Sequence, residues 1–163
     1  MLIGEKSTFG IEWAAGSSFG GFNYGHFRFW IENEPIGAWD EEVVLGVLLQ
    51  SAAVFLRFKG KRYLRQADYM TSVELWNYVD RYCNSDNPEE MQVALAGSYR
   101  ARFLMHEISD DSVSTVCKAV LVEEITGAQR LLWKNNESKN VHEKKYTKLT
   151  VDGVIEGFIA QAK

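Results

Sequence analysis

The sequence predicts an α+β fold in which an antiparallel, meandering sheet packs against a buried helix and a C-terminal amphipathic helix. Three observations favour this class: apolar residues alternate in residues 8–13, residues 43–56 are apolar on almost every side, and residues 151–162 repeat apolar residues at helical spacing. The chain has 163 residues, of which 46% are hydrophobic and 25% charged, and this suffices for one core. We therefore expect a single globular domain over residues 1–163.

The N-terminal segment predicts two strands joined by a loop. Residues 8–13 place apolar side chains at every second position and predict the first strand. Residues 14–25 contain four glycines and predict a mobile connection. The aromatic-rich residues 26–33 resemble a second strand, and residues 34–37 predict a turn, because Pro35 has no N–H to donate to a strand ladder.

A buried helix is expected next. Asp40, followed by Glu41 and Glu42, predicts its start, because acidic side chains bond the free N–H groups of the first turn and complement the positive end of the helix dipole. The helix is expected to run to about Arg57. Because it is apolar on nearly every side, it should lie centrally or against a sheet.

Two further helices have clear start signals. The sequence Thr-Ser-Val-Glu at residues 71–74 has the spacing of a capping box and predicts a helix over residues 72–83. Asn87 followed by Pro88 predicts a third helix, which Gly97 should end.

The C-terminal part predicts strands followed by a helix. Residues 99–108 and 113–124 are strand-like, and a Thr-Gly turn predicts a hairpin over residues 113–134. The polar residues 135–148 predict a solvated loop. The apolar face of the final helix consists of Val151, Val154, Ile155, Phe158, Ile159 and Ala162.

Charge is distributed unevenly along a chain whose formal net charge is −4. Residues 1–56 hold two basic residues against seven acidic ones, a local balance of −5, whereas residues 57–65 hold five basic residues among aromatic ones. Such a basic segment is compatible with nucleic-acid contact, but the acidic total disfavours a nucleic-acid partner. We expect its side chains to lie over apolar surface and to pair with the acidic half. An acidic patch can steer a basic partner, although acidic surface also serves solubility alone.

The sequence contains no catalytic motif. His26, His106 and His142 lack metal-binding spacing, and Cys83 and Cys117 lie far apart. The acidic doublets occupy helix starts, a turn and a strand end, where charge has ordinary structural roles. They stand at residues 41–42, 89–90, 110–111 and 123–124. We predict no catalytic residue, no metal and no cofactor, and a structural role for His106.

The start of the chain lacks the basic and apolar regions of a signal peptide. The longest apolar stretch, residues 43–56, is shorter than the ~20 residues that span a bilayer. Together with the two cysteines, these features predict a cytoplasmic protein without membrane contact.

The five tryptophans divide into two groups. Trp13, Trp30 and Trp76 fall on patterned elements and are expected in the core. Trp39 precedes the buried helix and Trp133 ends a strand, so both should be less buried. An exposed tryptophan is a common interface anchor, although partial burial within the monomer is the more frequent fate of this residue.

The N-terminal third carries a pattern that is similar to one protein family. The pattern comprises Ile3-Gly4, a Phe-x-Ile strand at residues 9–11, a Gly-x-Phe-x-Phe-x-Ile strand at residues 25–31, and Pro35. The chain resembles immunity protein family 42 of bacterial polymorphic-toxin and contact-dependent growth inhibition systems. The resemblance implies a protein encoded beside a toxin, which binds the toxin's C-terminal domain in the cytoplasm without catalysis and without a cofactor.

The resemblance gives the charge asymmetry a meaning, because many toxin domains are nucleases with basic grooves that an acidic face can occupy. The partner-binding residues that we predict are Glu32, Glu34, Trp39, Asp40, Asp110 and Asp111. Two other function classes stay open. One is a small-molecule or peptide-binding module, with a pocket lined by the aromatic strand and the glycine-rich segment. The other is an enzyme that uses the acidic doublets. The identity of the toxin and self-association are undecided.

Overall fold

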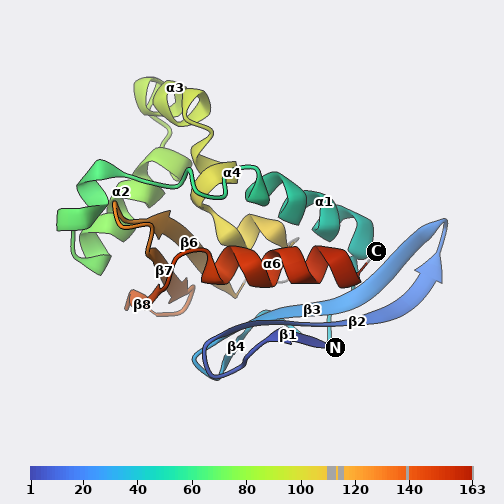
Figure 1. The fold of residues 1–163 in the computed structure, drawn as a ribbon. Coiled ribbons are helices and arrows are strands. Elements are labelled where there is room, and N and C mark those ends of the chain that lie inside the picture. Colours follow the sequence, from blue (N-terminus) through green and yellow to red (C-terminus); the bar gives the residue numbers. More distant parts are fainter. Residues whose placement is uncertain (110–112, 114–115, 139, 163) are drawn as a thin grey trace.

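The computed structural model describes residues 1–109, 113, 116–138 and 140–162, and it arranges them in two antiparallel sheets with helices around them (Figure 1). The strand order is β1-β2-β3-β4 in the first sheet, with β5 paired to β3, and β6-β7-β8 in the second. The predicted α+β class is confirmed, and α1 and α6 cover one face of the first sheet. Among the described residues, none of the helices combines the length and the apolar composition that a bilayer crossing demands.

The strands are β1 (Leu2–Gly4), β2 (Phe9–Phe19), β3 (Phe22–Ile31), β4 (Glu34–Ile36), β5 (Val43–Val44), β6 (Cys117–Glu123), β7 (Gln129–Asn135) and β8 (His142–Tyr146). The α-helices are α1 (Leu45–Leu56), α2 (Ser72–Asn84), α3 (Pro88–Ala96), α4 (Tyr99–Phe103) and α6 (Thr150–Gln161). Two short 3₁₀ helices are η1 (Arg65–Tyr69) and η2 (Met105–Ile108).

The second sheet lies between two apolar cores. Ala119 and Leu121 face the larger core, which the first sheet, α1 and α6 complete. Val120 and Val122 face the opposite way, into a smaller core formed with α2 and α4. This burial on both faces explains why β6 is apolar almost without interruption.

The predicted loop at residues 14–25 is wrong. Strand β2 continues to Phe19 and β3 begins at Phe22, so only Gly20 and Gly21 form the turn, with φ angles of 60° and 83°. A two-residue turn with positive φ at both positions matches the twist of the strands that it joins, and glycine adopts these angles without steric cost. The glycines therefore close a long β-hairpin.

The predicted turn at residues 34–37 lies two residues too late. Glu32 and Asn33 make the turn, with φ angles of 51° and 69°, and β4 follows at once. Pro35 pairs with Trp30 of β3. Because β4 pairs on one side only, the missing N–H of proline is tolerated there.

The predicted helix start at Asp40 is wrong, because α1 begins at Leu45. Val43 and Val44 form β5 and pair with Tyr24 and Gly25 of β3. Valine suits a strand, and no side chain caps the helix at Val44. The buried face of α1 consists of Leu45, Leu48, Ala52 and Phe55.

Helices α2 and α3 are confirmed at their predicted starts. Thr71 Oγ1 accepts the N–H of Glu74 at 3.3 Å, and the Glu74 carboxylate accepts the N–H of Thr71 at 2.9 Å. This is the reciprocal bonding of a capping box. Asn87 Oδ1 accepts N–H groups of the first turn of α3, Pro88 is its first residue, and Gly97 is its C-cap.

The predicted strand at residues 99–108 is wrong, because these residues form α4 and η2. Leu104, between the two, makes only an isolated bridge with Val120. Phe103 and Met105 are fully buried, one in each core. A short apolar run is compatible with either a strand or a helix, and here packing against both cores favours the helical conformation.

The predicted hairpin over residues 113–134 is confirmed for β6 and β7, although β6 begins at Cys117. Residues 114–115 lie outside the described residues. The predicted loop at residues 135–148 is wrong, since it contains β8, which pairs with β7. Its polar residues are explained by cross-strand ion pairs such as Arg130 Nε to Glu143 Oε1, at 2.7 Å.

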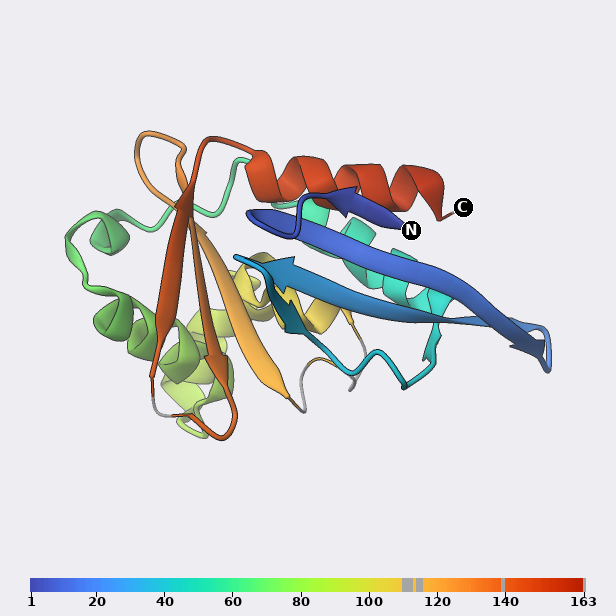
Figure 2. The same cartoon turned by 90° about the horizontal axis from the view of Figure 1, so that it is seen from below.

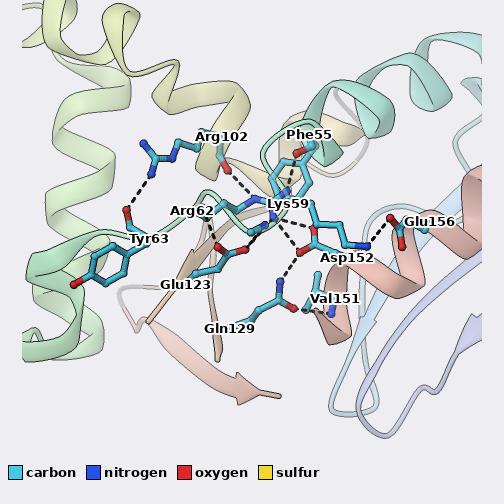
Figure 3. A network of polar contacts seen from close by, with 11 residues as sticks. Phe55, Lys59, Arg62, Tyr63, Arg102, Glu123, Gln129, Val151, Asp152 and Glu156 are labelled. Carbon is cyan, nitrogen blue, oxygen red and sulfur yellow. Dashed lines mark hydrogen bonds and ion pairs between the residues drawn. The ribbon is translucent and has the colours of Figure 1, made fainter. Parts of the chain in front are cut away.

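The basic segment at residues 57–65 pairs with α6, so the prediction that it pairs with the acidic N-terminal half is wrong. Lys59 Nζ lies 2.7 Å from Glu156 Oε1. Arg62 Nη1 lies 2.8 Å from Asp152 Oδ1, and both of these side chains are fully buried (Figure 3). The segment follows α1 directly, and α1 packs on α6, which explains the choice of partner.

Further hydrogen bonds complete the network around Arg62. Its Nη2 donates to Phe55 O at 2.7 Å, and its Nε donates to Arg102 O at 2.9 Å. Gln129 Nε2 donates to the Asp152 carboxylate at 2.6 Å. Burial lowers the pKa of Arg62, while the charge of Asp152 opposes this shift. The network joins α1, α4, β7 and α6 within the protein interior (Figure 3).

Candidate functional site

One side of the first sheet is turned away from α1 and α6, and no described helix lies in front of it (Figure 2). The register places Glu12 opposite Arg28, and Trp30 opposite Pro35. Because residues directly paired in a sheet point to the same side, these side chains share one face, while their chain neighbours fill the core. We define the outer face as the residues Glu12, Ala14, His26, Arg28, Trp30 and Pro35.

Cationic and aromatic side chains alternate across the outer face. Lys6 Nζ lies 4.0 Å from the centre of the Trp30 ring. The guanidinium carbon of Arg28 lies 4.7 Å from the Trp30 ring and 4.6 Å from the Trp39 ring. The Trp39 and His26 ring centres are 5.6 Å apart. Each cation–ring contact of this kind contributes about 0.5–2 kcal/mol. We call these five residues the cation–aromatic row.

Glu12 holds the row in place. Its carboxylate accepts hydrogen bonds from Arg28 Nε and from Trp30 Nε1, both at 2.8 Å, and Lys6 Nζ lies 3.6 Å away. Burial acts to raise the pKa of Glu12, but the hydrogen bonds from Arg28 and Trp30 and the two positive charges outweigh it, so the pKa is lowered. One ionised carboxylate thus fixes the orientation of three members of the row.

Trp39 and Asp40, two of the predicted contact residues, lie at the outer face. Trp39 reaches the row from the connection between β4 and β5 and is half-buried against Arg28 and His26. Asp40 follows it and is exposed. Among the described residues, Asp40 has no ion-pair partner.

The other predicted contact residues lie elsewhere. Glu32 is in the turn between β3 and β4 and forms an ion pair with Lys144 of β8. Glu34 is exposed in β4, but its register position opposite Ile31 puts it on the core-facing side of the sheet edge. Asp110 and Asp111 lie outside the described residues.

Lys6, Arg28 and Trp30 were not among the predicted contact residues. The signal that identifies Arg28 and Trp30 is the alternation in β3, where even-numbered residues are partly exposed and odd-numbered residues are buried from position 25 onward, whereas Lys6 lies in the turn between β1 and β2 and has no such signal. The strand was predicted from its aromatic residues, so its two faces were not separated.

The tryptophans follow the predictions only in part. Trp13 and Trp76 are buried, as predicted. Trp30 was expected in the core and lies on the outer face. Trp133 was expected to be less buried and is only 3% exposed, because β7 is the central strand of the second sheet.

The described residues show little convergence of catalytic groups. They contain no cluster of three or more His, Cys, Asp or Glu side chains that suits a metal ion. His106 is buried and its Nδ1 accepts the N–H of Ala119 at 3.1 Å, in keeping with the predicted structural role. Burial lowers its pKa. His26 belongs to the row, and His142 stacks on Trp133 in the second sheet.

A cavity of about 600 Å³ lies between α2, α3 and α4, with Tyr82, Met91 and Tyr99 in its lining. The aromatic strand β3 and the glycine-rich segment contribute nothing to it. This cavity therefore does not support the small-molecule or peptide-binding alternative, which was based on β3 and the glycine-rich segment.

Comparison with known proteins identifies a family and a solved structure that are similar to this chain. A family model described as Immunity protein 42 matches residues 1–161. The crystal structure of CdiI from Burkholderia dolosa AUO158 has the same fold, with a TM-score of 0.74 and 16% sequence identity, and the match covers 99% of each chain. A search of curated proteins finds no match.

Proposed function

Because the chain belongs to the Immunity protein 42 family, it is an immunity protein that neutralises a toxin, and we propose that the toxin domain binds to the outer face of its first sheet. The proposal includes three finer points: the partner is a C-terminal toxin domain, binding takes place in the cytoplasm, and inhibition involves no catalysis by this chain. An inhibitor of this kind acts by covering surface that the toxin needs.

The observation that carries the proposal is the cation–aromatic row. Binding energy in protein interfaces concentrates in Trp, Tyr and Arg side chains near the centre of the contact. Glu12 holds Trp30 and Arg28 in advance, and Arg28 packs on Trp39, so little conformational entropy is lost when a partner covers them. The opposite face of the first sheet and both faces of the second sheet are covered by the protein's own cores.

Exposed acidic residues at the outer face and at the neighbouring edge of the sheet support a basic partner, such as a nuclease with a basic groove. Asp40 lies at the outer face, whereas Glu34 lies on the core-facing side of the β4 edge; both are exposed and have no ion pair within the described part of the chain. Glu32 is already paired with Lys144, so its charge is partly compensated. Unpaired acidic side chains raise the rate at which a basic partner associates.

We predict that Trp39→Ala weakens binding of the purified toxin domain encoded beside this chain by about 10- to 100-fold, since a central interface Trp typically contributes at this level. Isothermal titration calorimetry measures the change in Kd. Tyr69→Ala is the matched control, because Tyr69 is an aromatic residue, 87% exposed, in η1, away from the first sheet. Equal affinities for Trp39→Ala and Tyr69→Ala would reject the outer face as the binding site.

We predict that Glu34→Lys combined with Asp40→Lys lowers the association rate about 10-fold or more at low salt and flattens its dependence on salt concentration, because steering by charge is screened by ions. Stopped-flow kinetics at several salt concentrations measures both effects. The double variant Asp86→Lys/Glu137→Lys changes the net charge equally, at exposed positions outside the first sheet. If both double variants have the same association rate and salt dependence, the change in net charge alone explains the effect. The assignment of Glu34 and Asp40 as contact residues is then refuted.

A further inference from the structure

The hairpin of β2 and β3 extends beyond the body of the protein as an arm (Figures 1 and 2). We define the arm as residues 15–24. Residues 15–23 are all exposed, and in both views the arm projects past the ends of α1 and α6. The arm continues the same two strands that carry the outer face.

Two phenylalanines form the tip of the arm. Phe19 and Phe22 are directly paired across the Gly20-Gly21 turn. Their side chains are 77% and 58% exposed. Apart from chain neighbours, nothing lies within 4 Å of the position where a Cβ would stand on either glycine, so the turn has open space beside it. Adjacent exposed aromatic residues in a soluble protein mark an interaction site more often than chance.

The arm is held in a defined direction. Ser17 donates to the Glu42 carboxylate through its backbone N–H at 3.2 Å and through Oγ at 2.9 Å. Ser18 Oγ donates to Asn23 Oδ1 at 2.8 Å across the two strands. At its base the arm is paired with β5 through Tyr24. These bonds reduce the entropy lost when the tip enters a partner.

Charge on and near the arm indicates the kind of partner. The sequence contains no Asp, Glu, Lys or Arg between Glu12 and Arg28, so the arm is uncharged over its whole length. Asp40 and Glu41, next to its base, are exposed and unpaired among the described residues. An anionic membrane surface would repel these carboxylates, and so would the same acidic base on a second copy of the chain. An apolar pocket with basic residues around it is the complementary surface.

We infer that the arm is a second toxin-binding element, which inserts Phe19 and Phe22 into an apolar pocket of the toxin domain bordered by basic side chains. The inference rests on the proposed binding of a toxin domain by this chain. It adds a contact that the outer face does not supply, because the tip lies beyond the cation–aromatic row along β2 and β3.

The test is Phe19→Ser combined with Phe22→Ser, with the purified toxin domain encoded beside this chain as the probe. The expected result is a Kd at least 100-fold weaker and an unchanged midpoint of urea unfolding, since both side chains are exposed. The variant Phe19→Leu/Phe22→Leu keeps apolar side chains and should bind within about 10-fold of the unchanged protein. Toxin affinity that the serine variant fully retains overturns the inference.

Trp39→Ala, measured beside it, separates this inference from the proposed function. If Trp39→Ala loses toxin binding and the serine variant binds fully, the arm is rejected as a toxin-binding element and the outer face is retained as the binding site. If the serine variant loses toxin binding and Trp39→Ala binds fully, the arm is retained and the outer face is rejected. Light scattering tests whether the tip instead binds a second copy of the chain. Flotation with vesicles of phosphatidylcholine and phosphatidylserine tests whether it binds an anionic membrane. A dimer, or vesicle binding, that the serine variant loses while its toxin affinity is unchanged assigns the tip to that occupant and overturns the inference.

Discussion

Asp152→Ala is expected to lower the free energy of unfolding by about 3–5 kcal/mol, because it leaves the Arg62 guanidinium buried without its closest counter-ion. Both side chains are fully buried, so water cannot replace the lost carboxylate. Gln129 Nε2 loses its acceptor in the same step. Urea unfolding followed by tryptophan fluorescence measures the change.

Glu156→Ala is the matched control for this prediction. Glu156 lies one helical turn further along α6 and pairs with Lys59, but its side chain is 48% exposed. Exposed ion pairs contribute about 0–1 kcal/mol, so this variant should unfold close to the unchanged protein. Equal destabilisation by the two variants would mean that the Arg62 network adds nothing beyond an ordinary surface ion pair.

Phe158→Ala is expected to lower the free energy of unfolding by about 3–5 kcal/mol, because it opens a cavity where α6 meets the first sheet. The Phe158 ring is fully buried and lies 6.0 Å from the Trp13 ring and 5.4 Å from the Phe27 ring. The same urea titration measures the loss. Phe19→Ala removes an identical side chain from the exposed tip of the arm and should change stability by less than about 0.5 kcal/mol. A comparable loss in both variants would contradict the assignment of Phe158 to the core.

Two glycines of the N-terminal pattern explain why that pattern identified the fold but no contact residue. Gly4 has a φ of 78°, and a Cβ there would lie 2.4 Å from Phe9 O. A Cβ on Gly25 would lie 2.4 Å from Ala14 O. Both positions exclude larger residues through backbone packing within the first sheet. The pattern therefore reflects which residues the backbone packing of the first sheet allows.

The candidate site was predictable only in part. Trp39 was predicted as a contact residue from its position in the turn before the buried helix, and it belongs to the cation–aromatic row through its contact with Arg28. Glu32 was identified from charge alone, and its ion pair with Lys144 joins segments 112 residues apart in the chain. A sequence pattern contains no information on such a partner, because neither residue lies in a local motif.

The sequence by itself determined the elements whose signals are local. The capping box of α2, the Asn-Pro start of α3 and the apolar spacing of α6 each act over a few residues, so they were identified correctly. The tertiary structure alone decided the helical form of residues 99–108 and the partner of Arg62. These features depend on contacts between distant segments, and the free energy of burial in those contacts outweighs local propensity.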